Sequence, residues 1–188
     1  SEAGILIIAN EVLNGDTNDK NSSIITSWLA AQHIPVKTIR VIRDDKKEII
    51  KALHQLKKQV SIIITTGGLG NTHDDITSES IAKALNKPLL IHQETVEFLK
   101  QKFKIDTLTP LQEKLAYLPY KAIPIHNPIS FAPGFIIDQI YAFPGFPDLV
   151  EAMLPYAEHY LKHHQPIHSA VILSPHKEAL LAEALYNI

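Results

Sequence analysis

The sequence contains no cysteine. This absence excludes disulfide bonds, thiolate nucleophiles and cysteine-ligated zinc, and it fits a protein of the reducing cytoplasm. No apolar run approaches the roughly 18 residues that a membrane-spanning helix needs, so we expect no membrane partner. Net charge is also scarce, because 18 Lys and Arg against 20 Asp and Glu give 18 − 20 = −2. Such a chain has no overall positive field to hold a nucleic-acid backbone, and we expect no nucleic-acid partner.

The 188 residues are 45% hydrophobic and 20% charged, as in ordinary globular proteins. This length suggests one large domain with a short appendage. We place the domain at residues 1–164 and the appendage at 165–188, where an apolar strand-like run precedes a segment of helical periodicity.

Short apolar runs alternate with segments of helical periodicity through the first half of the chain. This alternation predicts an α/β fold, a three-layer α/β/α arrangement around a mostly parallel sheet. In such sheets ligands bind at the carboxyl ends of the strands, so function is expected in the strand-to-helix loops. Strands are predicted at 4–9, 36–42 and 60–66. Helices are predicted after each of them, the first capped by Asn21 and the others beginning near Asp45 and Ile76.

The pattern loosens from Lys87 to Pro133, which we interpret as an insertion containing a helix around 94–103. Residues 134–137 and 139–143 then predict a β-hairpin. A Pro-Gly-Phe-Pro turn at 144–147 leads into a helix that reaches about residue 161.

The strongest local signal is TTGGLGNTHDD at residues 65–75, where glycines stand between a strand and a helix. Backbone N–H groups of such a loop can cradle a phosphate. We therefore predict phosphate contacts from Gly67, Gly68 and Gly70, and from the loop residues Asn71 and Thr72. The competing interpretation is that the glycines only make a tight connection.

Carboxylates gather in the same predicted region. Asp74 and Asp75 follow the glycines, and adjacent acids beside a phosphate suit a divalent cation such as Mg²⁺. Glu11 and Asp44 follow the first two strands and should converge on the same rim. Asp44 and the acids after the glycines could instead cap helices. His73 could donate a hydrogen bond to phosphate or point outward.

Three segments, ANEVLNGDTNDKN at 9–21, RDD at 43–45 and TTGGLGNTHDD, together resemble the amino-terminal domain of the CinA family. That domain belongs to the molybdopterin-binding, MoaB/MogA-like superfamily. NPISFAPGF at 127–135 and FPGFP at 143–147 resemble later motifs of the same family. The resemblance runs from about residue 5 to residue 161.

The resemblance implies a pocket for a phosphate-bearing pterin or nucleotide, and a homo-oligomer that is a dimer or trimer. It assigns catalysis to Asp44 and Asp75, metal binding to Asp74 and Asp75, and ligand-binding motif positions to Glu11 and Asn21. The implied activity is metal-dependent hydrolysis of a nucleotide pyrophosphate such as ADP-ribose, with Mg²⁺, Mn²⁺ or Co²⁺. We expect no nicotinamide-nucleotide deamidase activity, because these 188 residues include no counterpart of the family's deamidase domain.

Some positions depart from the family pattern. Asn71 replaces a usual proline, Ser78 stands where a basic residue is common, and Glu113 replaces another basic residue. These changes predict a phosphate rim that has lost cations. They leave open a second hypothesis, in which the domain binds a pterin or nucleotide without catalysis.

Overall fold

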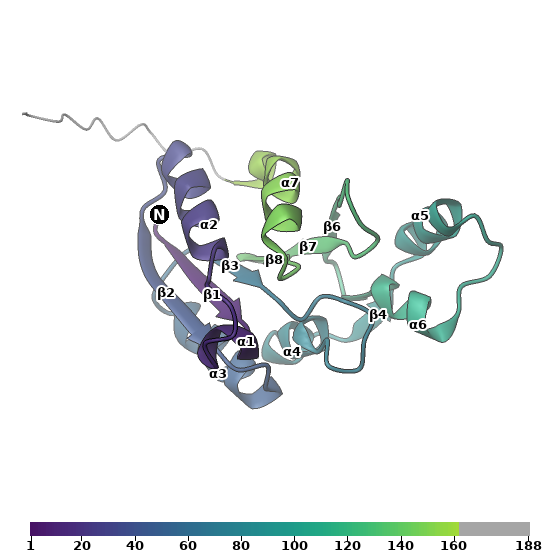
Figure 1. Ribbon diagram of the computed structural model, residues 1–188, viewed down its shortest axis with the longest axis horizontal. Coiled ribbons are helices and arrows are strands. Elements are labelled where there is room, and N and C mark those ends of the chain that lie inside the picture. Colours follow the sequence, from purple (N-terminus) through teal and green to yellow (C-terminus); the bar gives the residue numbers. More distant parts are fainter. Residues whose placement is uncertain (162–188) are drawn as a thin grey trace, which may run out of the picture.

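The structure is a computed structural model that describes residues 1–161 (Figure 1). The appendage that we predict at 165–188 lies outside the described residues. No helix among residues 1–161 is long and apolar enough to cross a membrane.

A six-stranded sheet forms the centre of the domain, with the order β2-β1-β3-β8-β7-β6. The first four strands in this order run parallel, whereas β7 pairs antiparallel with both β8 and β6. The predicted mostly parallel sheet and the predicted hairpin are therefore confirmed. The strands are β1 (Ala3–Ile8), β2 (Val36–Ile42), β3 (Ile62–Thr66), β6 (Ile123–Ile125), β7 (Gly134–Ile137) and β8 (Ile140–Phe143).

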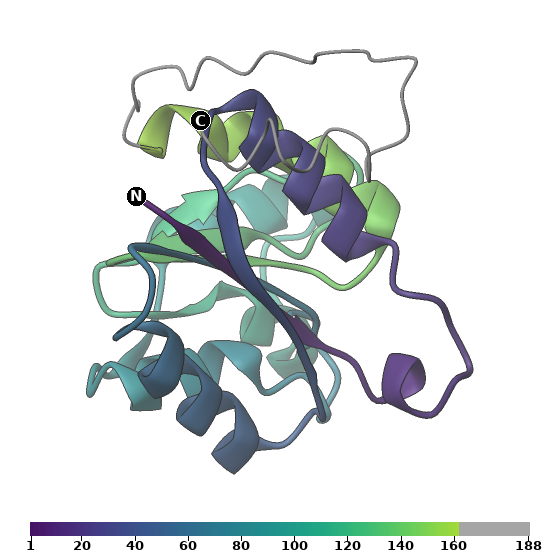
Figure 2. The same ribbon diagram turned by 90° about the vertical axis from the view of Figure 1, so that its left-hand side faces the viewer.

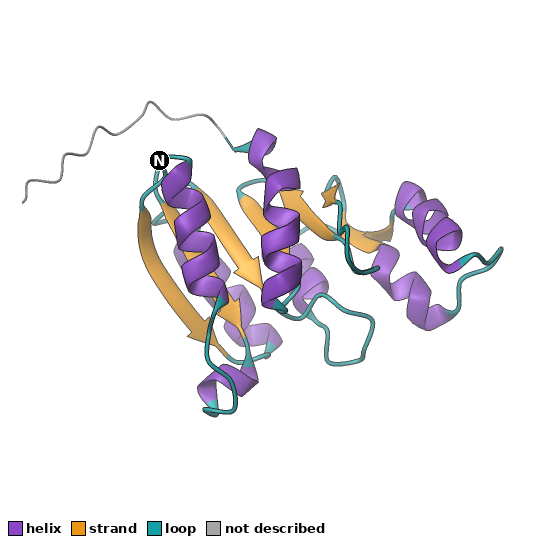
Figure 3. Cartoon of the chain, turned by 45° about the horizontal axis from the view of Figure 1, so that its top comes forward, coloured by secondary structure: helices purple, strands orange, loops and turns teal. Residues whose placement is uncertain are grey.

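Helices cover both faces of the sheet, which completes the three predicted layers (Figures 2 and 3). Helices α2 (Asn21–Ala31) and α7 (Pro147–Ala157) pack on one face, with α7 continuing into the 3-10 turn η2 (Glu158–Tyr160). Helices α3 (Lys46–Leu56) and α4 (Thr77–Ala84) pack on the other. Strands β1 and β3 are buried along their whole length, which explains their continuous apolar sequences.

The side chains that cap the amino-terminal ends of α2 and α3 are not the ones that the sequence first suggests. Asp45 caps α3 by accepting a hydrogen bond from the Glu48 N–H, so Asp44 is not the cap. At α2 the Asp19 carboxylate accepts a bond from the Ser22 N–H at 3.1 Å. Our prediction that Asn21 caps this helix is wrong, because its amide turns into the protein instead.

Residues 89–119 form a small unit that we call the satellite lobe. Its two strands contact α4, and its helices lie far from α2 and α3 (Figure 1). It contains β4 (Leu89–Ile91), α5 (Gln93–Phe103), α6 (Pro110–Glu113), the 3-10 turn η1 (Lys114–Ala116) and β5 (Tyr117–Pro119), with an apolar cluster of its own. The predicted insertion is confirmed for this lobe. The predicted range, Lys87 to Pro133, was too long, because β6 lies within it and belongs to the main sheet. Pro124 obscured that strand, and proline is tolerated there because β6 is an edge strand.

Candidate functional site

The loops that follow β1, β2, β3 and β8 meet at one edge of the sheet, as the parallel topology requires. The loop after β1 carries the short helix α1 (Asn10–Leu13), which includes Glu11. The loop after β8 brings Gly145 against the glycine loop, since a Cβ added at Gly145 would lie 3.3 Å from Gly67 Cα. Segments far apart in the sequence therefore build this edge together.

The glycine loop has a conformation that other residues could not adopt. Gly67 has φ +103°, and a Cβ there would lie 2.1 Å from the Ile8 carbonyl oxygen. Gly68 has φ +65°, and a Cβ there would lie 2.3 Å from the Thr77 hydroxyl oxygen. These glycines are thus required by the backbone geometry.

Thr77 holds this loop, and sequence reasoning missed it. The buried Thr77 hydroxyl donates to the Gly67 carbonyl at 2.8 Å, and the Thr77 N–H donates to the Gly68 carbonyl at 3.1 Å. The only sequence signal is a threonine at the first residue of the helix after a glycine loop.

Asp75 folds back onto the loop. Its Oδ2 accepts hydrogen bonds from the Thr72 N–H at 2.9 Å and the Thr72 hydroxyl at 2.7 Å. A Cβ added at Gly70 would lie 2.3 Å from the same oxygen, so glycine leaves the space that this carboxylate occupies. Asn71 between them is half-buried. The structure therefore places Asp75 inside the predicted phosphate site.

Asp44 faces the glycine loop, with Oδ1 lying 3.3 Å from the position of a Cβ on Gly68. This oxygen is buried and has no hydrogen-bond partner among residues 1–161. Burial, followed by the charges of Asp75, Glu11 and Asp74, raises the pKa of Asp44 from 3.8 to about 6. The charged form of Asp44 is thus destabilised, and a cation or a hydrogen-bond donor would stabilise it.

Asp74 does not join this group. Its side chain is 77% exposed and pairs at 2.9 Å with His73, whose side chain is 91% exposed. Within the described part of the chain, no group of three or more His, Asp or Glu residues could by itself hold a metal ion. A divalent cation held by Asp44 and Asp75 would therefore need oxygen ligands from a bound phosphate as well.

The satellite lobe contributes a cation that sequence reasoning missed. The Lys114 ammonium donates a hydrogen bond to the Thr72 carbonyl. With Gly68, Gly70 and Asp75 it lines a cavity of about 110 Å³. The expectation of a rim without cations is therefore incomplete. Lys114 lies in a short 3-10 turn, where no periodic pattern indicates which side chains meet.

A second small cavity, of about 50 Å³, lies on the other side of Gly145. Glu11 and Asn21 line it, as the motif positions suggested. Asn21 is only 6% exposed, and its amide nitrogen donates to the Gly145 carbonyl at 2.7 Å and to the Thr66 hydroxyl at 3.3 Å. The predicted residues Glu11 and Asn21 thus border the glycine loop without belonging to its cavity.

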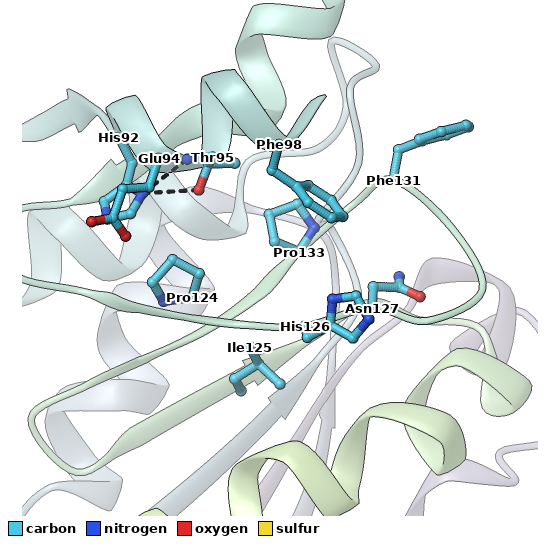
Figure 4. Close-up of a pocket in the computed structure, with 10 residues that line it drawn as sticks. All are labelled: His92, Glu94, Thr95, Phe98, Pro124, Ile125, His126, Asn127, Phe131 and Pro133. Carbon is cyan, nitrogen blue, oxygen red and sulfur yellow. Dashed lines mark hydrogen bonds between the residues drawn. The ribbon is translucent and has the colours of Figure 1, made fainter. Parts of the chain in front are cut away.

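A larger cavity lies elsewhere, between α5 and β6, and has a volume of about 200 Å³ (Figure 4). Phe98 and His126 form its aromatic wall with ring centroids 5.9 Å apart. Two of its polar side chains are bonded within the protein, since His92 bonds to Thr95 and the Asn127 amide bonds to its own loop. Asn127, Phe131 and Pro133 of the motif at 127–135 line it, but none of the predicted catalytic, phosphate-binding or metal-binding residues lies there. We place the functional site at the glycine loop, beside the buried, unpaired oxygen of Asp44.

A three-layer α/β domain whose glycine loop, acidic rim and Pro-Gly turn meet at the carboxyl edge of the sheet defines the class of molybdopterin-binding domains. Residues 4–163 match the family model described as a probable molybdopterin binding domain. The chain belongs to this family, and within it to the CinA-like members of the MoaB/MogA superfamily.

Individual relatives agree with this assignment. The crystal structure of CinA from Thermoplasma acidophilum, a protein described as having unknown function, has a TM-score of 0.81 and 32% identity, covering 85% of this chain and 96% of that one. A CinA-like protein of Fusobacterium nucleatum is 38% identical over 163 residues, which are 86% of this chain but 40% of that protein. MoaB from Thermus thermophilus, a molybdopterin biosynthesis enzyme, shares the fold at a TM-score of 0.58 and 19% identity, covering 86% of this chain and 92% of that one.

Proposed function

We propose that the chain binds a phosphate-bearing small molecule, a pterin or a nucleotide, with its phosphate on the glycine loop. The observation that carries this proposal is the free backbone of the loop. No backbone carbonyl of residues 1–161 accepts a hydrogen bond from the N–H groups of Gly68, Leu69, Gly70 or Asn71. Consecutive free N–H groups in a strained glycine turn form a concave anion site.

One positive charge beside the loop, that of Lys114, supports this proposal. Lys114 stands over the cavity with its ammonium on the Thr72 carbonyl, where it can also pair with a phosphate oxygen. The family assignment adds a pterin as one ligand class, because the matching model describes molybdopterin binding. A nucleotide is the other class, since it offers the same phosphate.

A second candidate function is metal-dependent hydrolysis of a nucleotide pyrophosphate such as ADP-ribose. The observation that favours it is the buried, unpaired Oδ1 of Asp44 beside the loop. Asp44 and Asp75 would hold the Mg²⁺, Mn²⁺ or Co²⁺, which would neutralise phosphate charge and lower the pKa of a bound water. Hydrolysis would add water across the P–O–P bond, breaking it and releasing a proton to the solvent, to give AMP and ribose 5-phosphate.

Calorimetric titration with ADP, ADP-ribose and a phosphorylated pterin tests the binding proposal, each with and without divalent metal. We expect at least one ligand to bind, and binding to be lost in Gly68→Ala, whose Cβ would meet the Thr77 hydroxyl. Following AMP release from ADP-ribose under each metal tests hydrolysis. Binding without AMP release would leave the binding function and remove the catalytic one; no binding of any ligand would remove both.

The chain spans about two fifths of the Fusobacterium relative, so the activities of such longer proteins are not transferred to it. Assembly into a dimer or trimer and a cytoplasmic location stay predictions.

A further inference from the structure

A stripe of positive charge runs along the outer face of α3. Lys47, Lys51 and Lys58, the last in the turn just after the helix, recur at spacings of four and seven residues. These spacings place side chains on the same side of a helix. All three lysines are exposed, opposite the buried side chains of α3 such as Leu53. Together with Ile50, His54 and Gln55 they line a shallow surface hollow of about 400 Å³.

Acidic residues of the same molecule do not neutralise this basic stripe. Every ion pair among residues 1–161 involves other side chains, so Lys47, Lys51 and Lys58 have no carboxylate partner there. Like charges four residues apart on a helix repel each other, as those of Lys47 and Lys51 do. An acidic surface laid along the stripe would relieve this repulsion.

Helix α7 and the turn η2 carry a stripe of the opposite sign. Residues 122–161 contain no lysine or arginine, and Asp148, Glu151 and Glu158 recur there at spacings of three and seven residues. Asp148 and Glu151 are exposed, and Glu158 is half-buried. None of the three has a basic partner among residues 1–161, and the neighbouring helix α2 has no charged residue. The acidic stripe is thus as uncompensated as the basic one.

The two stripes match in spacing. At a rise of about 1.5 Å per helical residue, the basic groups lie about 6 and 10.5 Å apart along the helix, and the acidic groups about 4.5 and 10.5 Å apart. Laid side by side in the same direction, the stripes would form three pairs, Lys47 with Asp148, Lys51 with Glu151 and Lys58 with Glu158. Pro155 is exposed between Glu151 and Glu158, so its ring would face the hollow of the basic stripe.

The stripes cannot meet within one molecule, because α3 and α7 cover opposite faces of the sheet (Figure 2). We infer that the basic stripe of one copy of this chain binds the acidic stripe of a second copy. Such a contact is head-to-tail, because each bound pair of copies leaves one basic and one acidic stripe free to add further copies. Exposed ion pairs are individually weak and are screened by salt, so the association is reversible and salt-sensitive. It does not depend on a ligand at the glycine loop.

Sedimentation velocity of the full 188-residue chain over a range of protein concentrations tests this inference. At about 20 mM salt we expect the mean mass to rise with concentration, and at about 500 mM salt to fall to a constant value. Lys51→Glu and Glu151→Lys should each weaken the low-salt association about tenfold or more, because each places like charges opposite one another. Lys102→Glu makes the same charge change as Lys51→Glu on α5, outside both stripes, and should associate like the wild type.

Charge exchange gives the sharper result. The double variant Lys51→Glu with Glu151→Lys should regain association to within about threefold of the wild type, because the pair is restored with its signs reversed. An equimolar mixture of the two single variants should associate as well, since each supplies the charge that the other lacks. Melting temperatures check that the variants fold, and Lys47→Glu with Asp148→Lys is a second pair to exchange.

A mean mass that does not change with salt or concentration would overturn the inference. So would weakening by only one of the two charge reversals, or no recovery in the double variant, because different surfaces would then be in contact. Binding of poly-glutamate to the wild type without self-association would assign the basic stripe to another acidic protein and overturn it too. Each of these outcomes leaves the proposed ligand binding at the glycine loop untouched.

Discussion

The glycine-loop cleft and the cavity under α5 differ in almost every physical property. Two separate cavities, of about 110 and 50 Å³, lie beside the glycine loop, whereas the α5 cavity holds about 200 Å³. Backbone strain and unpaired buried oxygens of Asp44 and Asn21 occur beside the cleft. Beside the α5 cavity, the Asn127 amide is fully bonded within its own loop.

This difference teaches that cavity volume is a poor guide to function in this domain. Apolar and aromatic walls such as those of Phe98 and His126 can surround a gap simply because two packing units meet imperfectly. Strained backbone and unpaired buried acceptors, in contrast, raise the free energy of the folded protein. A fold retains such features where a bound ligand offsets their cost. This argument favours the glycine loop over the α5 cavity as the functional site.

The largest expected effect comes from Gly67→Ala. The new methyl group would meet the Ile8 carbonyl oxygen at 2.1 Å, at a φ of +103° that alanine rarely adopts. We expect a loss of about 3 kcal/mol or more in unfolding free energy, measured by chemical denaturation, together with loss of phosphate-ligand binding. As a comparison in the α5 cavity, His126→Ala should leave ligand affinity unchanged. If His126→Ala reduced affinity as much, the contrast between the two cavities would fail.

Next in size is Asp75→Asn, which removes charge at nearly constant shape. We expect about a 10- to 100-fold loss of metal-dependent ligand affinity with little change in melting temperature, because the carboxylate contributes to a cation site. Asp74→Asn is the matched control, since Asp74 is the neighbouring residue but points outward. Titrations with and without metal measure both variants. Equal losses in the two would refute the metal role of Asp75.

A smaller effect is expected for Lys114→Gln. The ammonium of Lys114 lies at the rim of the cleft, so its loss should weaken binding of a phosphate ligand about five- to tenfold. This loss should shrink at high salt, because an exposed charge is screened. Lys58→Gln makes the same charge change just beyond the end of α3. A salt-independent loss, or the same loss in Lys58→Gln, would show that Lys114 does not contact the phosphate.

The smallest of these expected effects is a change in the pH dependence of folding stability in Asp44→Asn. The pKa of Asp44 is raised to about 6 in the folded protein, so ionisation of this carboxyl opposes folding. Between about pH 4 and 6 the folded state holds the extra proton, and the stability of the wild type should therefore fall as pH rises through this window. Asp44→Asn should remove that slope and be about 1 kcal/mol more stable at pH 7, after allowance for solvent screening. Denaturation midpoints across this pH range measure it; an unchanged slope would contradict the prediction.

Sequence patterns predicted the main sheet and its covering helices because their signals are local. A strand buried on both faces is mostly apolar, as β1 and the first three residues of β3 are, and a covering helix needs an apolar stripe. The glycines at 67 and 68 were also readable, because the backbone there admits no other residue. The edge strand β6 escaped prediction, since it is short, contains Pro124 and owes its place to pairing with β7.

The sequence by itself thus determined the three-layer α/β domain, the glycine loop and the acids near it. Only the tertiary structure decided which side chains act together. It turned Asp75 onto the loop and Asp74 away, brought Lys114 over Thr72 from the satellite lobe, and placed Asn21 against Gly145. The physical reason is that periodicity reports which face of an element is buried. The contacts between loops depend on chain closure and on side-chain hydrogen bonds, which leave no periodic trace.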